Sequence, residues 1–286
     1  MGPLPSLYNP VLSEESWKAL RTACEGERIT ATPSLLTGWE PIDRTLPQGG
    51  LAGAKVHEWI GVGSGDPAPP LDRCWLPPLA ILLSLAYRAA TCAHRSGGAK
   101  GQAAQGRLLL WIGERVWPFP GSLTDRPDDP RLARSIFVRA DHPGERLWAA
   151  DLALRSGTAA AVIADGSRLD LSATRRLQLA AEAGGGLCFL ARPPWERGEL
   201  SAAATRWHVT TAQPMHHAGT RGRTHAPLHP TRRWTVELLR CKGVQPSTAG
   251  TRRWILEHDR ETRHGLVAAE LLDRSGETAP AQRRHG

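Results

Sequence analysis

The chain has 286 residues, of which 41% are hydrophobic and 22% charged, the composition of a folded, soluble protein. Its most apolar stretch, residues 76–90, is interrupted by prolines and an arginine and is too short to span a bilayer. The five cysteines are far apart, without the spacing of a zinc site or a disulfide framework, and the first residues do not read as a secretory signal. We therefore predict a cytoplasmic protein with no membrane segment and no metal centre.

The net charge of +8 is concentrated in the last third of the chain. Residues 201–286 hold 14 Lys and Arg against seven Asp and Glu, a local charge of +7, together with eight of the eleven histidines. A surface of this sign attracts polyanions, DNA first among them. The alternative is a solvated basic surface that keeps the protein soluble.

Residues 1–33 are predicted to form an N-terminal helical arm. A helix capped by Ser13 would place Trp17, Leu20 and Cys24 on one narrow apolar face. That face must pack on the core or on a partner, so Trp17 and Leu20 are candidate partner-binding residues.

Residues 34–258 are predicted to form one α/β core domain. After a short helix at 40–46, strands are expected at 55–60, 107–112, 135–139, 159–164 and 187–191, and helices at 79–90, 145–156 and, capped by Ser172, 172–183. This alternation predicts a mostly parallel sheet flanked by helices. Strands at 203–212, 234–240 and 252–257 would add antiparallel pairing at the C-terminal edge. Residues 259–286 are predicted to be a basic, flexible tail with one helix, 266–272.

The first strand runs into WIGVGSGDPAPP, which begins like a phosphate-binding loop. Backbone N–H groups of the glycine-rich turn would form the phosphate nest; the candidates are Gly61, Gly63, Ser64 and Gly65. The positions of the usual Lys and Ser/Thr hold Pro67 and Ala68, and Asp66 adds a negative charge. We therefore favour a glycine-rich turn kept for folding over a site for ATP and Mg²⁺.

Two carboxylates follow apolar strands. Glu114 comes after RLLLWIG and Asp165 after AAAVIA, and strand ends of this kind border the crevice where α/β proteins bind ligands. The pair could act as a water-activating base and a magnesium-side carboxylate. The alternative is two solvated acids with no catalytic role.

The late strands carry tryptophans interleaved with arginines. Stacking tryptophans and phosphate-binding arginines would suit single-stranded DNA, whereas tryptophans in the core with arginines outside would be purely structural. The tryptophans are Trp195, Trp207, Trp234 and Trp254, and their neighbours include Arg192, Arg197 and Arg206. The arginines chosen as DNA-binding candidates are Arg232, Arg233, Arg252 and Arg253. The loop histidines His216, His217, His225 and His229 are interpreted as a polar loop rather than metal ligands.

The order of these elements resembles the core of RecA-type recombinases. More closely, LWAADLALRSGTAAAVIAD followed by LDLSATRRLQLAAEAGGGLCFLARP is similar to the ImuA family, RecA-like accessory proteins of a bacterial damage-inducible mutasome. The resemblance covers residues 35–257. It implies a RecA-like core, translesion synthesis in the SOS response, and three partners: RecA, an ImuB-type inactive Y-family polymerase and an error-prone replicative-type polymerase.

The resemblance also places the RecA phosphate loop on residues 61–68, the catalytic glutamate on Glu114 and the magnesium-side aspartate on Asp165. The leading hypothesis is a non-catalytic adaptor, since the loop lacks its Lys and Ser/Thr. A second is a DNA-dependent ATPase with Lys55 or Arg73 as the replacement cation. A third is a direct binder of single-stranded DNA.

Overall fold

The computed structural model describes residues 34–63, 74–95, 108–119, 122, 130–212, 232–244, 252–258 and 266–270. The predicted N-terminal arm lies outside these residues, as do the His-rich loop and most of the predicted tail.

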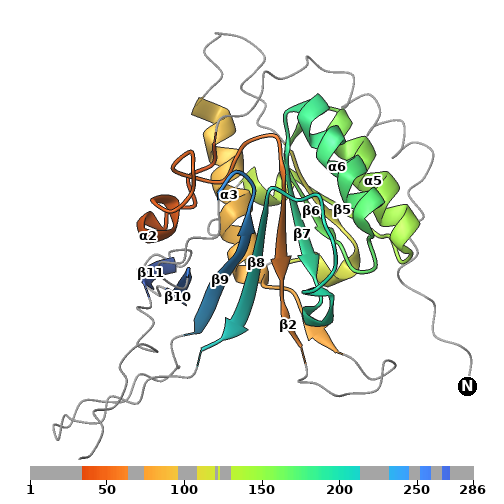
Figure 1. Cartoon of the computed structure of the whole chain (residues 1–286). Helices are drawn as coiled ribbons and strands as arrows, with labels where there is room; N and C mark the ends of the chain where they lie inside the picture. Colours follow the sequence, from red (N-terminus) through yellow and green to blue (C-terminus); the bar gives the residue numbers. More distant parts are fainter. Residues whose placement is uncertain are drawn as a thin grey trace, which may run out of the picture.

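A nine-stranded sheet forms the centre of the protein (Figure 1). Its order is β11-β10-β9-β8-β1-β7-β6-β4-β5. The six strands from β8 to β5 are parallel, and β9, β10 and β11 continue the sheet in antiparallel pairing. The predicted α/β class, with its antiparallel C-terminal edge, is confirmed. The strands are β1 (Val56–Ile60), β4 (Leu108–Ile112), β5 (Ser135–Val138), β6 (Ala159–Asp165), β7 (Leu187–Arg192), β8 (Thr205–Thr211), β9 (Arg233–Cys241), β10 (Arg253–His258) and β11 (Leu266–Glu270).

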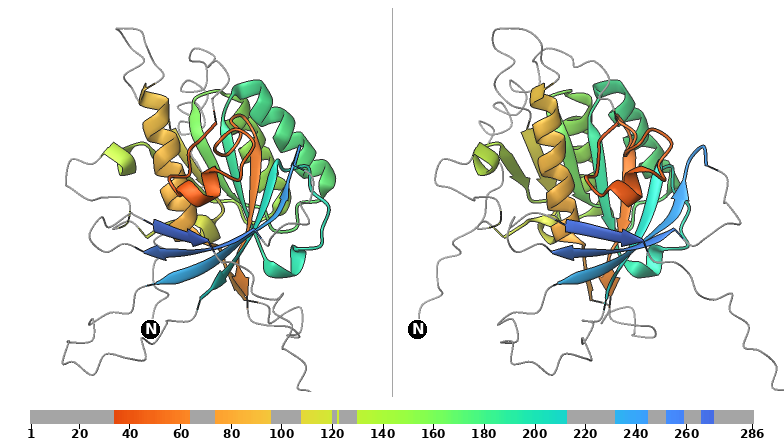
Figure 2. Two further views of the ribbon diagram at one scale, coloured as in Figure 1. Left: turned by 60° about the vertical axis from the view of Figure 1, so that its left-hand side comes forward. Right: turned by 90° about the vertical axis from the view of Figure 1, so that its left-hand side faces the viewer.

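Helices cover both faces of the parallel strands (Figures 1 and 2). The helix α3 (Leu79–Arg95) packs on one face, and α5 (Pro143–Arg155) and α6 (Leu171–Gly184) pack on the other. The antiparallel strands twist away toward the short helix α2 (Glu40–Asp43), which lies beside β11 (Figure 2). A separate hairpin of β2 (Val62–Gly63) and β3 (Trp75–Leu76) links β1 to α3. The remaining short helices are η1 (Glu114–Val116), α4 (Pro130–Ala133) and η3 (Pro194–Glu196).

The ends of α6 show how local sequence sets its limits. Asp170, and not Ser172 as predicted, is the N-cap: its carboxylate accepts a hydrogen bond from the Ala173 N–H at 2.8 Å. Ser172 instead donates its hydroxyl to the same carboxylate. The Asp170 carboxylate, two residues before Ser172, satisfies the Ala173 N–H group. Its negative charge also interacts favourably with the positive N-terminal end of the helix. The helix stops as predicted in the glycine run, where Gly185 adopts a left-handed φ of 71°.

Tryptophans of the late strands form part of the core. Trp59 and Trp207 are fully buried and stack with ring centroids 5.1 Å apart and an interplanar angle of 7°. Trp254 is also buried, 6.1 Å from Trp207. Trp234 packs partly buried against the same cluster, whereas Trp195 is 38% exposed. Trp207 and Trp254 therefore take the structural role, and neither is available to stack on a base.

The predicted helix at 266–272 is wrong. Leu266–Glu270 is the strand β11, paired antiparallel with β10 from Trp254↔Glu270 to His258↔Leu266. An edge strand leaves a row of backbone donors and acceptors unpaired, and a neighbouring segment that can satisfy them gains more from pairing than from forming an isolated helical turn. Local sequence carries no sign of this long-range partner.

A buried histidine joins β1 to β8 through a chain of hydrogen bonds. The indole N–H of Trp207 donates to the Thr205 hydroxyl at 2.7 Å, and that hydroxyl lies 2.8 Å from Nδ1 of His57. Nε2 of His57 lies 3.0 Å from the carbonyl oxygen of Ala52. Since a carbonyl can only accept, the network assigns the proton to Nε2, and Nδ1 accepts from the hydroxyl. Burial, only partly opposed by the bond to Ala52, lowers the pKa of His57 from 6.5 to about 4.

This shift predicts a loss of stability on mild acidification. Between pH 6.5 and 4 the imidazole of the unfolded chain binds a proton, whereas the buried imidazole does not. The contribution of neutral His57 to the free energy of unfolding is therefore complete above pH 6.5 and is lost as the pH falls toward 4. The full effect is on the order of 3 kcal/mol. His57→Gln keeps hydrogen-bonding groups but cannot titrate, so its loss of unfolding free energy between pH 7 and pH 4.5, measured by urea denaturation, should be smaller than the wild-type loss. Equal losses would contradict the assignment.

Candidate functional site

The carboxyl ends of the central parallel strands meet at one edge of the sheet, the place where open α/β sheets bind ligands. The turn after β1 begins at Gly61, β4 is followed by Gly113 and Glu114, and β6 ends at Asp165. A β-carbon added at Gly113 would lie 3.1 Å from Cβ of Asp165. The structure therefore brings the predicted loop and the two predicted carboxylates to the same edge.

The described part of the glycine-rich turn is packed against protein groups. The Gly61 N–H donates to the carbonyl oxygen of Arg192 at 2.8 Å. A β-carbon at Gly61 would lie 2.2 Å from the carbonyl oxygen of Leu76, and one at Gly63 would lie 2.5 Å from Cγ of Pro194. Both glycines thus permit close packing around the β2–β3 hairpin. The other predicted members of the nest, Ser64 and Gly65, lie outside the described residues, as do residues 66–73.

The start of α3 is also engaged. A phosphate site uses unpaired N–H groups at a helix N-terminus directly after the glycine loop. Here the Leu79 N–H donates to the Pro77 carbonyl at 2.8 Å, and the Ile81 and Leu82 N–H groups donate to the Pro78 carbonyl at 3.0 Å. The two prolines contribute no N–H of their own. On both sides of the loop, these described N–H groups are therefore bonded to protein carbonyls.

Glu114 opens the short helix η1 and is half exposed at the surface. Its carboxylate lies 3.3 Å from Nε of Arg139, whose guanidinium also lies 3.6 Å from Asp141. Gly113 allows the abrupt turn into η1 through its left-handed φ of 87°. The predicted catalytic base is thus part of a surface ion pair.

Asp165, the other predicted acid, is buried and already has partners on both oxygens. Oδ1 accepts from the Ser167 N–H at 2.9 Å, and Oδ2 lies 3.7 Å from Nε of Arg115. The Arg115 guanidinium also lies over the ring of Trp75, 5.7 Å from its centroid. The helix η1 therefore places a side-chain cation beside the carboxylate predicted to lie on the magnesium side.

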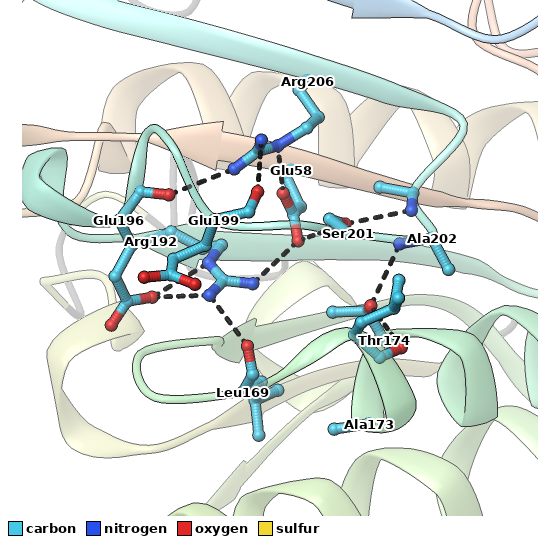
Figure 3. A network of polar contacts seen from close by, with 12 residues as sticks. Glu58, Leu169, Ala173, Thr174, Arg192, Glu196, Glu199, Ser201, Ala202 and Arg206 are labelled. Atoms are coloured by element: carbon cyan, nitrogen blue, oxygen red, sulfur yellow. Dashed lines mark hydrogen bonds and ion pairs between the residues drawn. The ribbon is translucent and has the colours of Figure 1, made fainter.

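A buried ion cluster of Glu58, Arg192, Glu196 and Arg206 lies next to this edge (Figure 3). Glu58 Oε1 accepts from Arg192 Nη1 at 3.0 Å, and Oε2 accepts from Arg206 Nε at 2.7 Å. Ser201 adds a third bond to Oε1, at 2.7 Å. Arg192 also donates through Nε and Nη2 to Glu196, at 3.0 and 2.7 Å. The two glutamates and two arginines balance in charge, as burial requires.

The cluster ties two loops to the sheet. Arg192 Nη2 donates to the Leu169 carbonyl after β6, and Arg206 donates to the carbonyls of Glu196 and Glu199 between β7 and β8. Glu196 accepts in turn from the Arg168 N–H. Burial acts to lower the pKa of Arg192, but Glu58 and Glu196 outweigh it and hold that pKa above its ordinary value. The cluster stabilises loops and presents no unpaired nucleophile.

Sequence reasoning missed this cluster. Its only local signal is one glutamate inside the strand VHEWI, all five residues of which are buried. The idea that Arg192 and Arg206 are outward-facing cations is wrong, because both side chains are bonded inside the cluster and nearly inaccessible.

The four DNA-binding candidates fall into two pairs. Arg233 is ion-paired with Glu257, and Arg253 lies 3.6 Å from Glu237. Arg232 is exposed and Arg252 half-buried, and neither makes an ion pair within the described residues. The partner-binding candidates Trp17 and Leu20 lie outside those residues.

The described part of the chain holds no group of three or more His, Cys, Asp or Glu side chains arranged to bind a metal ion. No helix there combines the length and apolarity needed to cross a membrane. The four loop histidines of the sequence analysis lie outside this part.

The ion cluster predicts a large difference between two isosteric changes. Glu58→Gln leaves two buried arginines opposite one glutamate, so it should lower the free energy of unfolding by about 3–5 kcal/mol. The matched control is Glu40→Gln, which removes the partner of Arg44 in a pair more than 70% exposed and should cost at most about 1 kcal/mol. Urea unfolding followed by circular dichroism measures both. Similar losses would show that Glu58 does not hold the loops.

No protein-family model matches the chain. Among curated proteins, the chain is 33% identical over 273 residues to Protein ImuA of Caulobacter vibrioides strain NA1000 / CB15N, covering 90% of this chain and 98% of the relative. The same figures hold for Protein ImuA of Caulobacter vibrioides strain ATCC 19089 / CIP 103742 / CB 15. Identity at this level over nearly the whole of both chains shows that the protein belongs to the ImuA family.

Proposed function

We propose that this ImuA-family protein is a non-catalytic adaptor in SOS-induced translesion DNA synthesis. In this role it binds RecA and an ImuB-type polymerase-like partner, and through them an error-prone replicative-type polymerase. Family membership supports the pathway. The chemistry of the strand-end edge supports the absence of catalysis, since a fold can persist after its site has lost function.

One observation carries the proposal: the described start of the turn after β1, residues 61–63, is packed on protein groups. The Gly61 N–H is bonded to Arg192, and Leu76 and Pro194 occupy the space beside Gly61 and Gly63. A phosphate would have to displace these contacts without the Lys that normally compensates its charge. Asp165 and Glu114 are matched by arginines, so neither calls for a metal ion to balance it.

The alternative, a DNA-dependent ATPase, needs a replacement cation. Lys55 does not suit this role, because it precedes β1 at the opposite end of the strand, about 17 Å from the turn, and pairs with Glu182 at 2.6 Å. Arg73, the other candidate, lies outside the described residues.

Calorimetry with Mg-ATP and pairwise co-elution with RecA and the ImuB-type protein test the proposal together. We expect no saturable heat with Mg-ATP and a stable complex with at least one protein partner. The matched variant is Glu114→Gln, which should behave as wild type because Glu114 only forms a surface pair. Turnover of ATP that Glu114→Gln abolishes would establish the ATPase instead. Failure to bind either protein at micromolar concentration would remove the adaptor role.

DNA remains a second candidate partner, favoured by Arg232 and Arg252, which make no ion pair with the residues that the structure describes. Arg232→Ala and Arg252→Ala should each weaken binding of a single-stranded oligonucleotide. Each should also reduce the slope of log affinity against log salt concentration by about one, because one fewer counterion is released on binding. Arg233→Ala should weaken oligonucleotide binding less, because the Arg233 guanidinium is already ion-paired with Glu257. Fluorescence anisotropy across a salt series measures this. Binding that does not vary with salt would exclude a phosphate-contacting role.

A further inference from the structure

A shallow groove of about 340 Å³ runs along the outer side of α6. One wall is the solvent-facing stripe of the helix, with Leu171, Arg175, Leu179 and Glu182. The opposite wall is Ala202 and Lys242, which come from the segment before β8 and the turn after β9. The helix α6 lies on the face of the sheet opposite α3, away from the β2–β3 hairpin (Figure 1).

The groove wall is fixed by hydrogen bonds. The Ala202 N–H donates to the Thr174 hydroxyl of α6 at 3.0 Å (Figure 3). Lys242 Nζ donates to the Ala202 carbonyl at 2.6 Å, and Arg240 donates to the carbonyls of Ser201 and Ala203 at 2.8 and 2.9 Å. The hydroxyl of Ser201 is itself bonded to the buried Glu58. The groove is therefore pre-organised, so a ligand would bind without ordering it first.

Positive charge gathers at one end of the groove. Lys55, Arg175 and Arg240 lie near enough to act electrostatically on Lys242, and the carboxylate of Glu182 acts on it as well, so these cations outnumber that acid four to one. Burial, followed by the fields of Arg240 and Lys55, lowers the pKa of Lys242. Within the described residues Arg175 makes no ion pair. Arg175 thus differs from Arg233 on β9 and Arg253 on β10, each of which lies near a glutamate.

Apolar side chains flank the unpaired charge. Leu171 is 45% exposed and Leu179 is 53% exposed. They are eight residues apart on α6, about 12 Å along the helix axis, with Arg175 midway between them. Two exposed leucines at this spacing offer an apolar contact at each end of a short peptide segment, with a cation between them.

We propose that this groove is the docking site for an acidic, leucine-bearing protein segment. Its apolar side chains would cover Leu171 and Leu179, and its carboxylates would pair with Arg175 and Lys242. A peptide uses both properties of the groove, whereas nucleic-acid interfaces are predominantly polar, so DNA would leave the leucines exposed. The inference deepens the adaptor role proposed above and rests on it for the source of the segment.

The test uses the full chain and a fluorescein-labelled peptide in which leucines alternate with aspartates. Wild-type protein should bind the peptide saturably, with an affinity that falls as salt rises. Arg175→Glu, Lys242→Glu and Leu179→Ser should each weaken binding roughly tenfold, as expected when a charge at an interface is reversed or an apolar anchor is lost. All three side chains are largely exposed, and circular dichroism confirms that each variant is folded.

The matched control is Arg232→Glu, the same charge reversal at the opposite end of β9 from Lys242. It should leave peptide binding unchanged. An equal loss in this variant, no binding by wild type, or binding insensitive to the groove substitutions would each overturn the proposal. So would a single-stranded oligonucleotide that competes for the groove and depends on the same three residues, or self-association lost in the same variants.

The groove variants also separate this inference from the adaptor role. If wild type binds the ImuB-type protein or RecA and the groove variants bind equally well, the groove is excluded and the adaptor role stands. If wild type binds neither protein, the adaptor role fails, and peptide binding by the groove is judged on its own result.

Discussion

The carboxylate of Glu58 is the buried charge on which much of the described structure depends. It lies in the middle of the sheet with no exposed surface, and it accepts hydrogen bonds from Arg192 on β7, Arg206 on β8 and Ser201 between them. A charge at that depth is tolerated only when it is fully paired. Satisfying it therefore fixes the two strands and the segment that joins them in one arrangement, and the remaining donors of the arginines reach the loops beyond.

The same contacts determine the character of the strand-end edge. A phosphate site directs backbone N–H groups and a cation outward into the crevice. In this protein the Gly61 N–H is bonded to the main chain of Arg192, and the cations at the edge, Arg115 and Arg139, lie beside Asp165 and Glu114. Donors and charges that a nucleotide would need are directed at neighbouring protein groups. The strand ends thus converge as they do around a ligand site, but the polar groups named here are bonded to other protein groups.

The strands and helices of the core could be predicted from sequence because periodicity and caps are local. The continuous apolar runs of β4, β6 and β7 mark buried parallel strands. The ion cluster could not be predicted in this way, because its bonds join residues 134 and 148 positions apart. Arg192 and Arg206 look like surface arginines until β1 is placed between their strands. The strand β11 was missed for a similar reason, since its pairing with β10 depends on an open edge elsewhere in the chain.

The position of β9 places positive charge at both of its ends. Arg232 stands just before the strand, and Arg240 and Lys242 stand at its other end, where each donates to main-chain carbonyls, whereas Arg233 is ion-paired with Glu257. The nine residues of β9 separate the two ends by about 30 Å, nearly four times the screening length of about 8 Å at physiological salt. An anion held at one end is therefore screened from the other. In the proposed adaptor, an acidic protein segment along α6 and a nucleic-acid backbone at the start of β9 would therefore not compete for the same charge.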